Sequence, residues 1–238
     1  MQIIGGTIYV GGTFKNGAGV PKADDLLACD LATGAPSTTV KLNSFNGTVY
    51  ALTADSKGRL YAGGTFSDLD GNSAANFVAY LDATGWHSMT NATGQGVTGI
   101  VRSLAASGTN VYVGTDALNI GGIPEADHVA RWDGSGWHAM GSNGSGDGWF
   151  PASYGSRVYA GGSFTNAGGN PLADRIAYFD GKWRPVGSNG AGDGPLNGTV
   201  NALDTYQNRL YAGGNFTSAG GNPAAQYIAS TPLPLLTH

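Results

Sequence analysis

The sequence predicts an all-β protein, a β-propeller of about five four-stranded blades that form one domain over residues 1–238. Three observations predict it. A short motif recurs five times, each repeat contains four short strand-like runs separated by turn residues, and no segment carries a helical apolar period. In addition, the chain has 41 glycines but is also 41% apolar. A disordered glycine-rich chain would lack those apolar residues, so the glycines indicate turns in a folded protein.

The recurring motif is an aliphatic residue followed by tyrosine, a small residue and glycine. Its tyrosines are 52, 51, 47 and 52 residues apart, at Tyr9, Tyr61, Tyr112, Tyr159 and Tyr211. A regular period of this length is typical of repeat architectures. Four strands in each repeat, repeated radially, are typical of a propeller.

The second repeat illustrates the expected strands, which we name a to d. Strand a covers residues 48–53, b covers 59–66, c covers 77–81 and d covers 86–89. Short turns of the hairpin type join a to b and c to d, whereas a long loop joins b to c.

The strand count is incomplete at both ends. The sequence suggests five b and c strands but four a and d strands, so the chain is expected to begin at b and end just after c. The tail over residues 231–236 is a candidate edge strand, where proline is tolerated. We expect the ring to be closed by both termini or by a neighbouring molecule, to stay open, or to belong to a larger propeller.

Aromatic residues follow the motif in the middle three repeats. A strand c aromatic precedes a strand d tryptophan in the pairs Tyr80/Trp86, Trp132/Trp137 and Tyr178/Trp183. With the glycine pair that ends strand b, this pattern resembles the glycine-rich kelch-like repeats of bacterial propellers related to the galactose-oxidase central domain. The first repeat departs from it, with Cys29 and Ala35 at the two aromatic positions.

The resemblance does not carry oxidase activity to this chain. Galactose oxidase needs a copper site with a Tyr–Cys crosslink, and the single cysteine here, Cys29, has no histidines in a matching context. No nucleophile elbow, phosphate-binding loop or zinc spacing occurs either. We therefore expect a non-enzymatic binding or scaffold module. The alternative is a hydrolase or lyase with acidic residues at the central channel.

Charge and hydropathy limit the partners. Only 12% of residues are charged, the net charge is −4, and no Lys/Arg run occurs, which argues against nucleic acid. No apolar run approaches 18 residues, so no membrane span is expected. Low charge with abundant Asn, Thr and Gly favours an extracellular or cell-surface protein. Its expected ligand is a glycan or a protein, and it is expected to be a monomer, or an oligomer if a neighbour closes the ring.

No cofactor is expected, although calcium is a minority interpretation of two kinds of polar turn. Residues 68–72 alternate oxygen-bearing side chains around a glycine, and the segment 143–148 recurs as 189–194. One polar position recurs at the start of strand c, at Asp25, Asn76, Asp127, Asp174 and Gln226. These side chains either tether the long loop to its own backbone or form a ring of ligand groups. His87 and His138 occupy equivalent positions, which indicates an architectural role.

Candidate ligand-binding residues come from breaks in the repeat pattern. The b–c and d–a loops fall on one rim of an up-and-down propeller, and long loops on a rigid scaffold commonly bind. The fourth repeat lacks six residues before strand a, which places Trp149 and Phe150 beside a notch in that rim, unless Trp149 fills the gap itself. The set of candidate ligand-binding residues is Trp149, Phe150, Asp147, Asp193 and Asp116. Trp137 is expected to be buried between blades.

Overall fold

The computed structural model describes residues 1–37, 45–141, 150–154 and 157–233. Within these ranges the protein is all-β, with antiparallel strands in five small sheets and short 3₁₀ turns as its helical elements. No helix in this part of the chain is long and apolar enough to cross a membrane.

The five sheets follow one another along the chain, and each has its strands in sequence order. The first contains β1 (Gln2–Ile4), β2 (Thr7–Gly11) and β3 (Leu26–Asp30). The second contains β4 (Val49–Ala54), β5 (Leu60–Gly64), β6 (Val78–Asp82) and β7 (Gly85–Ser88). The third contains β8 (Val101–Ser107), β9 (Asn110–Thr115), β10 (Val129–Trp132) and β11 (Trp137–Ala139). The fourth contains β12 (Phe150–Tyr154), β13 (Arg157–Gly161), β14 (Ile176–Phe179) and β15 (Trp183–Pro185). The fifth contains β16 (Val200–Tyr206), β17 (Arg209–Gly214) and β18 (Ile228–Pro232).

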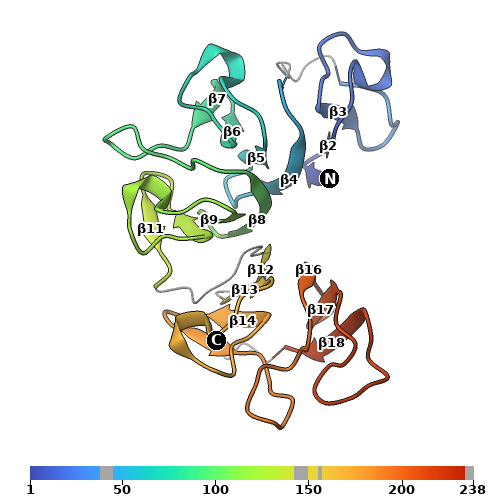
Figure 1. The fold of residues 1–238 in the computed structure, drawn as a ribbon. Coiled ribbons are helices and arrows are strands. Elements are labelled where there is room, and N and C mark those ends of the chain that lie inside the picture. Colours follow the sequence, from blue (N-terminus) through green and yellow to red (C-terminus); the bar gives the residue numbers. More distant parts are fainter. Residues whose placement is uncertain (38–44, 142–149, 155–156, 234–238) are drawn as a thin grey trace.

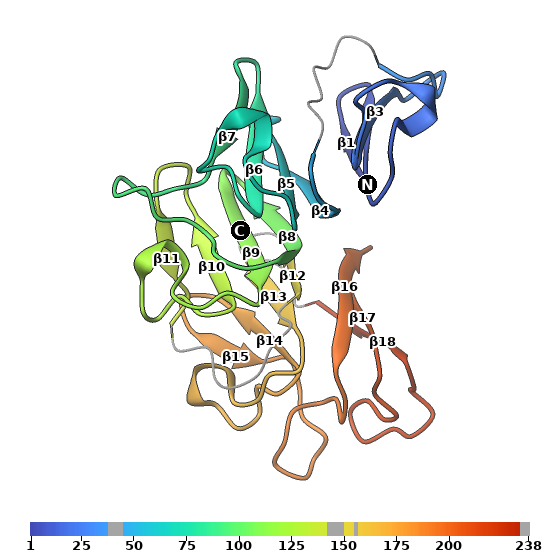
Figure 2. The same ribbon diagram turned by 45° about the horizontal axis from the view of Figure 1, so that its top comes forward.

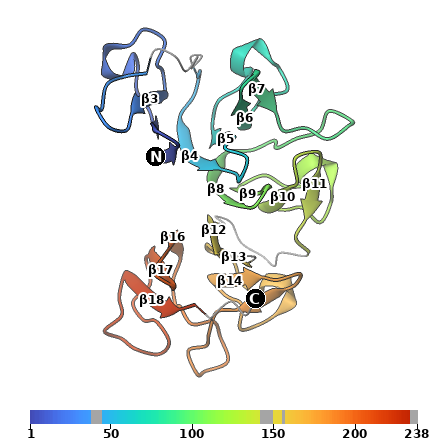
Figure 3. The same cartoon turned by 180° about the vertical axis from the view of Figure 1, so that it is seen from behind.

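The sheets are arranged in an arc around a common centre (Figure 1). The first strands β4, β8, β12 and β16 lie toward the middle, and the last strands lie outside. The first and fifth sheets form the two ends of the arc, and their ribbons stay apart in all three views (Figures 1, 2 and 3). The described sheets therefore form an open arc.

The expectation that the chain begins at strand b is wrong. Gly5 adopts a left-handed φ of 55° and, with Gly6, turns the chain back on itself. This turn lets β1 pair with β2, with Gln2 opposite Tyr9, so the first sheet has a short strand a. Among the described residues the two ends of the chain do not pair, since β1 belongs to the first sheet and β18 to the fifth. Closure through residues 234–238 stays a prediction, because these residues lie outside the described ranges.

Only residues 231–233 of the candidate edge strand over residues 231–236 are described. Thr231 and Pro232 are the end of strand c of the fifth sheet, β18. Leu233 is buried, and its backbone N–H donates to the Asn208 carbonyl at 2.9 Å. Residues 234–238 lie outside the described part of the chain.

The apolar core lies between consecutive sheets. The motif tyrosine of each of the first four sheets is buried in a cluster with residues of the next sheet. The motif glycine also contacts the next sheet. A Cβ added to Gly63 would lie 2.3 Å from Cγ1 of Val101, and one added to Gly161 would lie 2.5 Å from Cγ1 of Val200. Only glycine leaves room for this valine, which explains the Tyr-x-Gly motif physically.

The strand d tryptophans Trp86, Trp137 and Trp183 are buried on the side of the preceding sheet. The indole Nε1 of Trp137 donates to the Met89 carbonyl of the second sheet at 2.8 Å, which confirms its expected position between blades.

The expected strand c partners of these tryptophans need one correction. Trp137 pairs with Trp132, but Trp86 pairs with Leu81 and Trp183 with Phe179. Tyr80 and Tyr178 lie one residue earlier, so they face the opposite side of their sheets, because side chains alternate along a strand.

The recurring polar position tethers the b–c loop. The backbone N–H groups of Asp68 and Asn119 donate to Oδ1 of Asn76 and Asp127 at 2.8 Å in both cases. In the first sheet the same bond joins Asn16 N–H to Asp24, so Asp24 holds this position and the assignment of Asp25 was wrong by one residue. These bonds explain the repeated residue as a loop tether.

Candidate functional site

The rim with the long loops is held together by asparagine side chains. Asn46, in the crossover into the second sheet, accepts from Ser67 N–H at 2.8 Å and donates to Ser67 Oγ at 3.1 Å. Asn197 does the same for Thr217 in the fifth sheet, at 2.9 and 3.0 Å. Each asparagine fixes a d–a crossover to a b–c loop. The repeated Asn-Gly-Thr-Val sequence was a signal for this role that the sequence analysis did not use.

A hollow of about 560 Å³ lies on this rim between the second and third sheets, and we call it the rim hollow. It is formed by two b–c loops and the crossover between them. The crossover is fixed by Asn91, whose Oδ1 accepts from Gln95 N–H at 3.0 Å and whose Nδ2 donates to the Gly121 carbonyl at 2.7 Å. Its lining is uncharged, with amide and hydroxyl groups beside small apolar residues. The polar members of the lining are Ser73, Asn76, Thr90, Gln95, Thr98 and Asn119.

Most of the candidate residues of the fourth repeat lie outside the described part of the chain. Trp149 and Asp147 are not among the described residues. Phe150 opens β12 opposite Gly161, and the structure describes its backbone only. The roles expected for these three residues therefore stay predictions.

The two remaining candidates are described, and they lie apart from the rim hollow. Asp116 is exposed, with Oδ2 3.6 Å from an Arg102 guanidinium nitrogen. Asp193 is exposed in the crossover between the fourth and fifth sheets, where its N–H donates to Asn189 Oδ1 at 3.4 Å. Neither lines the rim hollow, and their part in binding also stays a prediction.

Histidine and aspartate pair at the c–d turns, on the other rim. His87 Nε2 lies 2.9 Å from Asp82 Oδ1, and His138 Nε2 lies 2.5 Å from Asp133 Oδ2. Hydrogen bonds from Thr84, with His87 adding to them, lower the pKa of Asp82 to about 2. In the fourth sheet Arg184 replaces the histidine and pairs with Asp180 at 2.9 Å. The contact with aspartate is kept when arginine takes the place of histidine, which supports an architectural role for these histidines.

Metal ligands do not converge in the described ranges, where no group of three His, Cys, Asp or Glu side chains could hold an ion. Asp68 and Asp70, from the turn interpreted as a calcium loop, are both exposed around a 3₁₀ turn. One of the two recurring segments, residues 143–148, lies outside the described residues. Calcium binding therefore stays an untested minority expectation.

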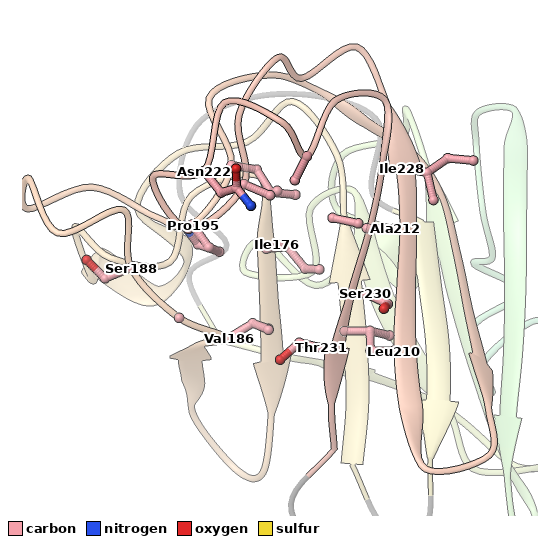
Figure 4. A pocket seen from close by; sticks show the side chains of 16 residues that line it. Ile176, Val186, Ser188, Pro195, Leu210, Ala212, Asn222, Ile228, Ser230 and Thr231 are labelled. Atoms are coloured by element: carbon pink, nitrogen blue, oxygen red, sulfur yellow. The ribbon is translucent and has the colours of Figure 1, made fainter.

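A second hollow, of about 480 Å³, lies between the fourth and fifth sheets, and we call it the edge hollow. Ile176 and Val186 line it from the fourth sheet, and Leu210, Ala212 and Thr231 line it from the fifth (Figure 4). None of the described residues that line it has a titratable side chain. The sequence analysis missed it, although a signal existed, since the fifth repeat has no tryptophan after strand c.

Comparison with known proteins yields a fold and no family. No protein-family model matches the chain, and no curated protein matches its sequence. Among solved structures it is similar to the extracellular domain of the one-component system BT4673 from B. thetaiotaomicron, with a TM-score of 0.58 and 11% identity. That match covers 99% of this chain but 27% of the other, so the chain spans about a quarter of that protein.

Two further structures are similar over most of their length. One is a chain of the nidogen/laminin complex, with a TM-score of 0.51, 12% identity and coverage of 96% of this chain and 80% of that one. The other is YjhT, with a TM-score of 0.50, 16% identity and coverage of 92% and 76%. These neighbours have all-β, propeller-like folds. The chain therefore shares an all-β, propeller-like arrangement with them.

Proposed function

We propose that this chain is a non-catalytic recognition module, a five-bladed propeller of kelch-like repeats that binds carbohydrate on its long-loop rim. The observation that carries the proposal is the uncharged, amide- and hydroxyl-rich lining of the rim hollow. Sugar hydroxyls both donate and accept hydrogen bonds. Amide and hydroxyl side chains also do both, so they match such a ligand without charge.

The loops around the rim hollow support the proposal, because hydrogen bonds from Asn91 hold the crossover in place. A rigid site loses less conformational entropy on binding. Two of the structural neighbours, an extracellular domain and a chain of the nidogen/laminin complex, are consistent with an extracellular binding role. That support is analogy at the level of the fold.

The test is a glycan array probed with the whole chain, followed by calorimetry on the strongest hit. Gln95→Ala removes one amide from the rim hollow and is expected to weaken binding by about 0.5–1.5 kcal/mol, the net value of a hydrogen bond. Lys182→Ala, in an exposed c–d turn on the other rim, is the matched control and should bind like wild type.

Three results would overturn the proposal or part of it. The binding proposal fails if no glycan binds, or if Gln95→Ala binds as tightly as Lys182→Ala. The non-catalytic part fails if mass spectrometry of the bound glycan after incubation shows cleavage products, which would instead favour the hydrolase or lyase alternative.

A further inference from the structure

The outer edge of the fifth sheet differs from the same edge of the second, third and fourth sheets. In the second, third and fourth sheets, strand c pairs on its outer side with β7, β11 and β15. Strand c of the fifth sheet, β18, pairs with β17 on its inner side. Among the described residues no strand pairs with its outer side. An edge of this kind presents backbone N–H and C=O groups that can accept another strand.

The edge hollow beside β18 occupies the position that tryptophan takes in the other sheets. Residues 219–223 repeat the sequence of residues 167–171, so Gly220 corresponds to Gly168. A Cβ added to Gly168 would lie 3.0 Å from Cβ of Trp183, and one added to Gly121 of the third sheet would lie 2.7 Å from Cβ of Trp137. A Cβ added to Gly220 would meet nothing within 4 Å. The glycine that normally faces the tryptophan is present, and no described residue lies within 4 Å of the Cβ position in front of it.

The other walls of the tryptophan site are also present. Val186 lies three residues after Trp183, as Met89 lies three residues after Trp86, and the Met89 carbonyl accepts the indole N–H of Trp137. Val186 lines the edge hollow.

Thr231 forms the opposite wall. By strand register it holds the position of Trp132 and Phe179, whose rings lie 5.2 and 5.3 Å from those of Trp137 and Trp183. The edge hollow is therefore a tryptophan site built by the same repeat and left unfilled by the described residues.

We propose that the outer edge of β18 and the edge hollow together bind an extended segment of a partner polypeptide that carries a tryptophan. The segment adds to the fifth sheet as a fourth strand antiparallel to β18, and its indole enters the hollow. Strand addition supplies backbone hydrogen bonds, and the aromatic anchor supplies specificity. The three tryptophan-filled interfaces within the chain are the template, so the proposal is independent of the carbohydrate site on the rim.

The edge hollow suits such an occupant in size and chemistry. Its volume of about 480 Å³ falls in the range of ligand pockets, roughly 300–1,000 Å³. Its apolar walls bury an indole ring, and the absence of titratable side chains from the lining means that no charge is desolvated.

The test uses the whole chain and a fluorescein-labelled peptide with the sequence of residues 134–140, which contains the tryptophan of β11. Fluorescence anisotropy should show saturable binding. Replacement of the peptide tryptophan by alanine should weaken it at least about tenfold, as expected for a buried aromatic anchor. Thr231→Trp should strengthen binding, because it adds the ring that faces the indole in the third sheet.

Two variants separate the edge hollow from unspecific binding. Val186→Trp fills the hollow from the side of the fourth sheet and should abolish binding. Leu31→Trp adds an aromatic in the turn after β3, at a position that is 45% exposed, and should not. Thermal melts establish that both variants fold.

Three results would overturn the proposal. One is that the labelled peptide binds neither to the wild-type chain nor to Thr231→Trp. Another is equal binding of the tryptophan and alanine peptides. The third is binding only after residues 234–238 are deleted, which would mean that the chain's own tail occupies the site. None of these results depends on glycan binding, so the two proposals fail separately.

Discussion

The third and fifth sheets come from the same repeat, but they differ in what covers them. In the third sheet Tyr112 and Val129 are buried, with exposed fractions of 7% and 0%. In the fifth sheet the corresponding Tyr211 is half-buried, and Ile228 is 71% exposed. The difference lies in the neighbours. The fourth sheet covers the third, and no described sheet follows the fifth.

The difference between the two sheets indicates that each sheet of this protein is stabilised mainly by its neighbouring sheets. Each apolar cluster combines residues from two consecutive sheets. Repeat proteins of this kind gain stability from the interfaces between units. The same side chain therefore stabilises the fold in the middle of the arc and forms an exposed apolar surface at its end, where such surfaces commonly bind partners.

The largest expected effect separates the two sheets directly. Trp137→Ala should lower the free energy of unfolding by about 3–5 kcal/mol, because it empties a buried site and leaves the Met89 carbonyl without its donor. Ile228→Ala should lower it by less than about 1 kcal/mol, because the side chain is largely exposed. Urea unfolding measures both, and equal losses would mean that the fifth sheet is covered in solution.

A smaller effect is expected at the motif glycines. Gly63→Ala should destabilise the protein by about 1–3 kcal/mol, because its new Cβ would lie 2.3 Å from Cγ1 of Val101. The matched Gly213→Ala should be tolerated, because among the described residues the nearest atom to its new Cβ is the Tyr227 carbonyl oxygen at 3.9 Å. Thermal melts compare the two variants. A large loss in Gly213→Ala would point to a neighbouring sheet packed against the fifth.

The smallest effect concerns pH and the c–d turns, which the described fifth sheet lacks. Hydrogen bonds from Thr84 lower the folded pKa of Asp82 to about 2, below its ordinary value of 3.8. Such a carboxylate stabilises the fold fully above about pH 4 and loses this contribution as the pH falls through the folded pKa.

Stability should therefore decrease between about pH 4 and pH 2, and Asp82→Asn should make this decrease shallower. The contribution of Asp82 should stay below about 1 kcal/mol, because the pair is solvent-screened. Denaturant unfolding at several pH values measures it. An identical pH profile in the variant would show that Asp82 makes no pH-dependent contribution.

Much of the fold was predictable, because its signals are local. The spacing of Tyr9, Tyr61, Tyr112, Tyr159 and Tyr211 predicted five repeated units. Turn residues marked the hairpins, and the pattern of strand d predicted the buried Trp137. Register was less predictable. The recurring polar position of the first repeat was assigned to Asp25 instead of Asp24. Tyr80 and Tyr178 were grouped with the strand d tryptophans, although they face the opposite side of their sheets. Both errors are shifts of one residue, and such a shift reverses the face on which a strand residue lies.

The site was less predictable than the fold. The rim with the long loops follows from topology, but the rim hollow depends on how Asn91 folds the crossover against the third sheet. The edge hollow depends on a comparison across sheets, between the open space at Gly220 and the indoles beside Gly121 and Gly168. No single repeat contains that information.

The sequence by itself determined the repeat, its four-strand pattern and the residues that pack between blades, because these depend on contacts at a fixed spacing along the chain. Only the tertiary structure decided that β1 supplies a strand a to the first sheet, that the described sheets form an open arc, and that the outer edge of β18 lies beside a hollow that no described tryptophan fills. The physical reason is that burial is a property of pairs of sheets. A motif specifies the surface it presents, and the neighbouring sheet determines whether that surface becomes core or stays open to a partner.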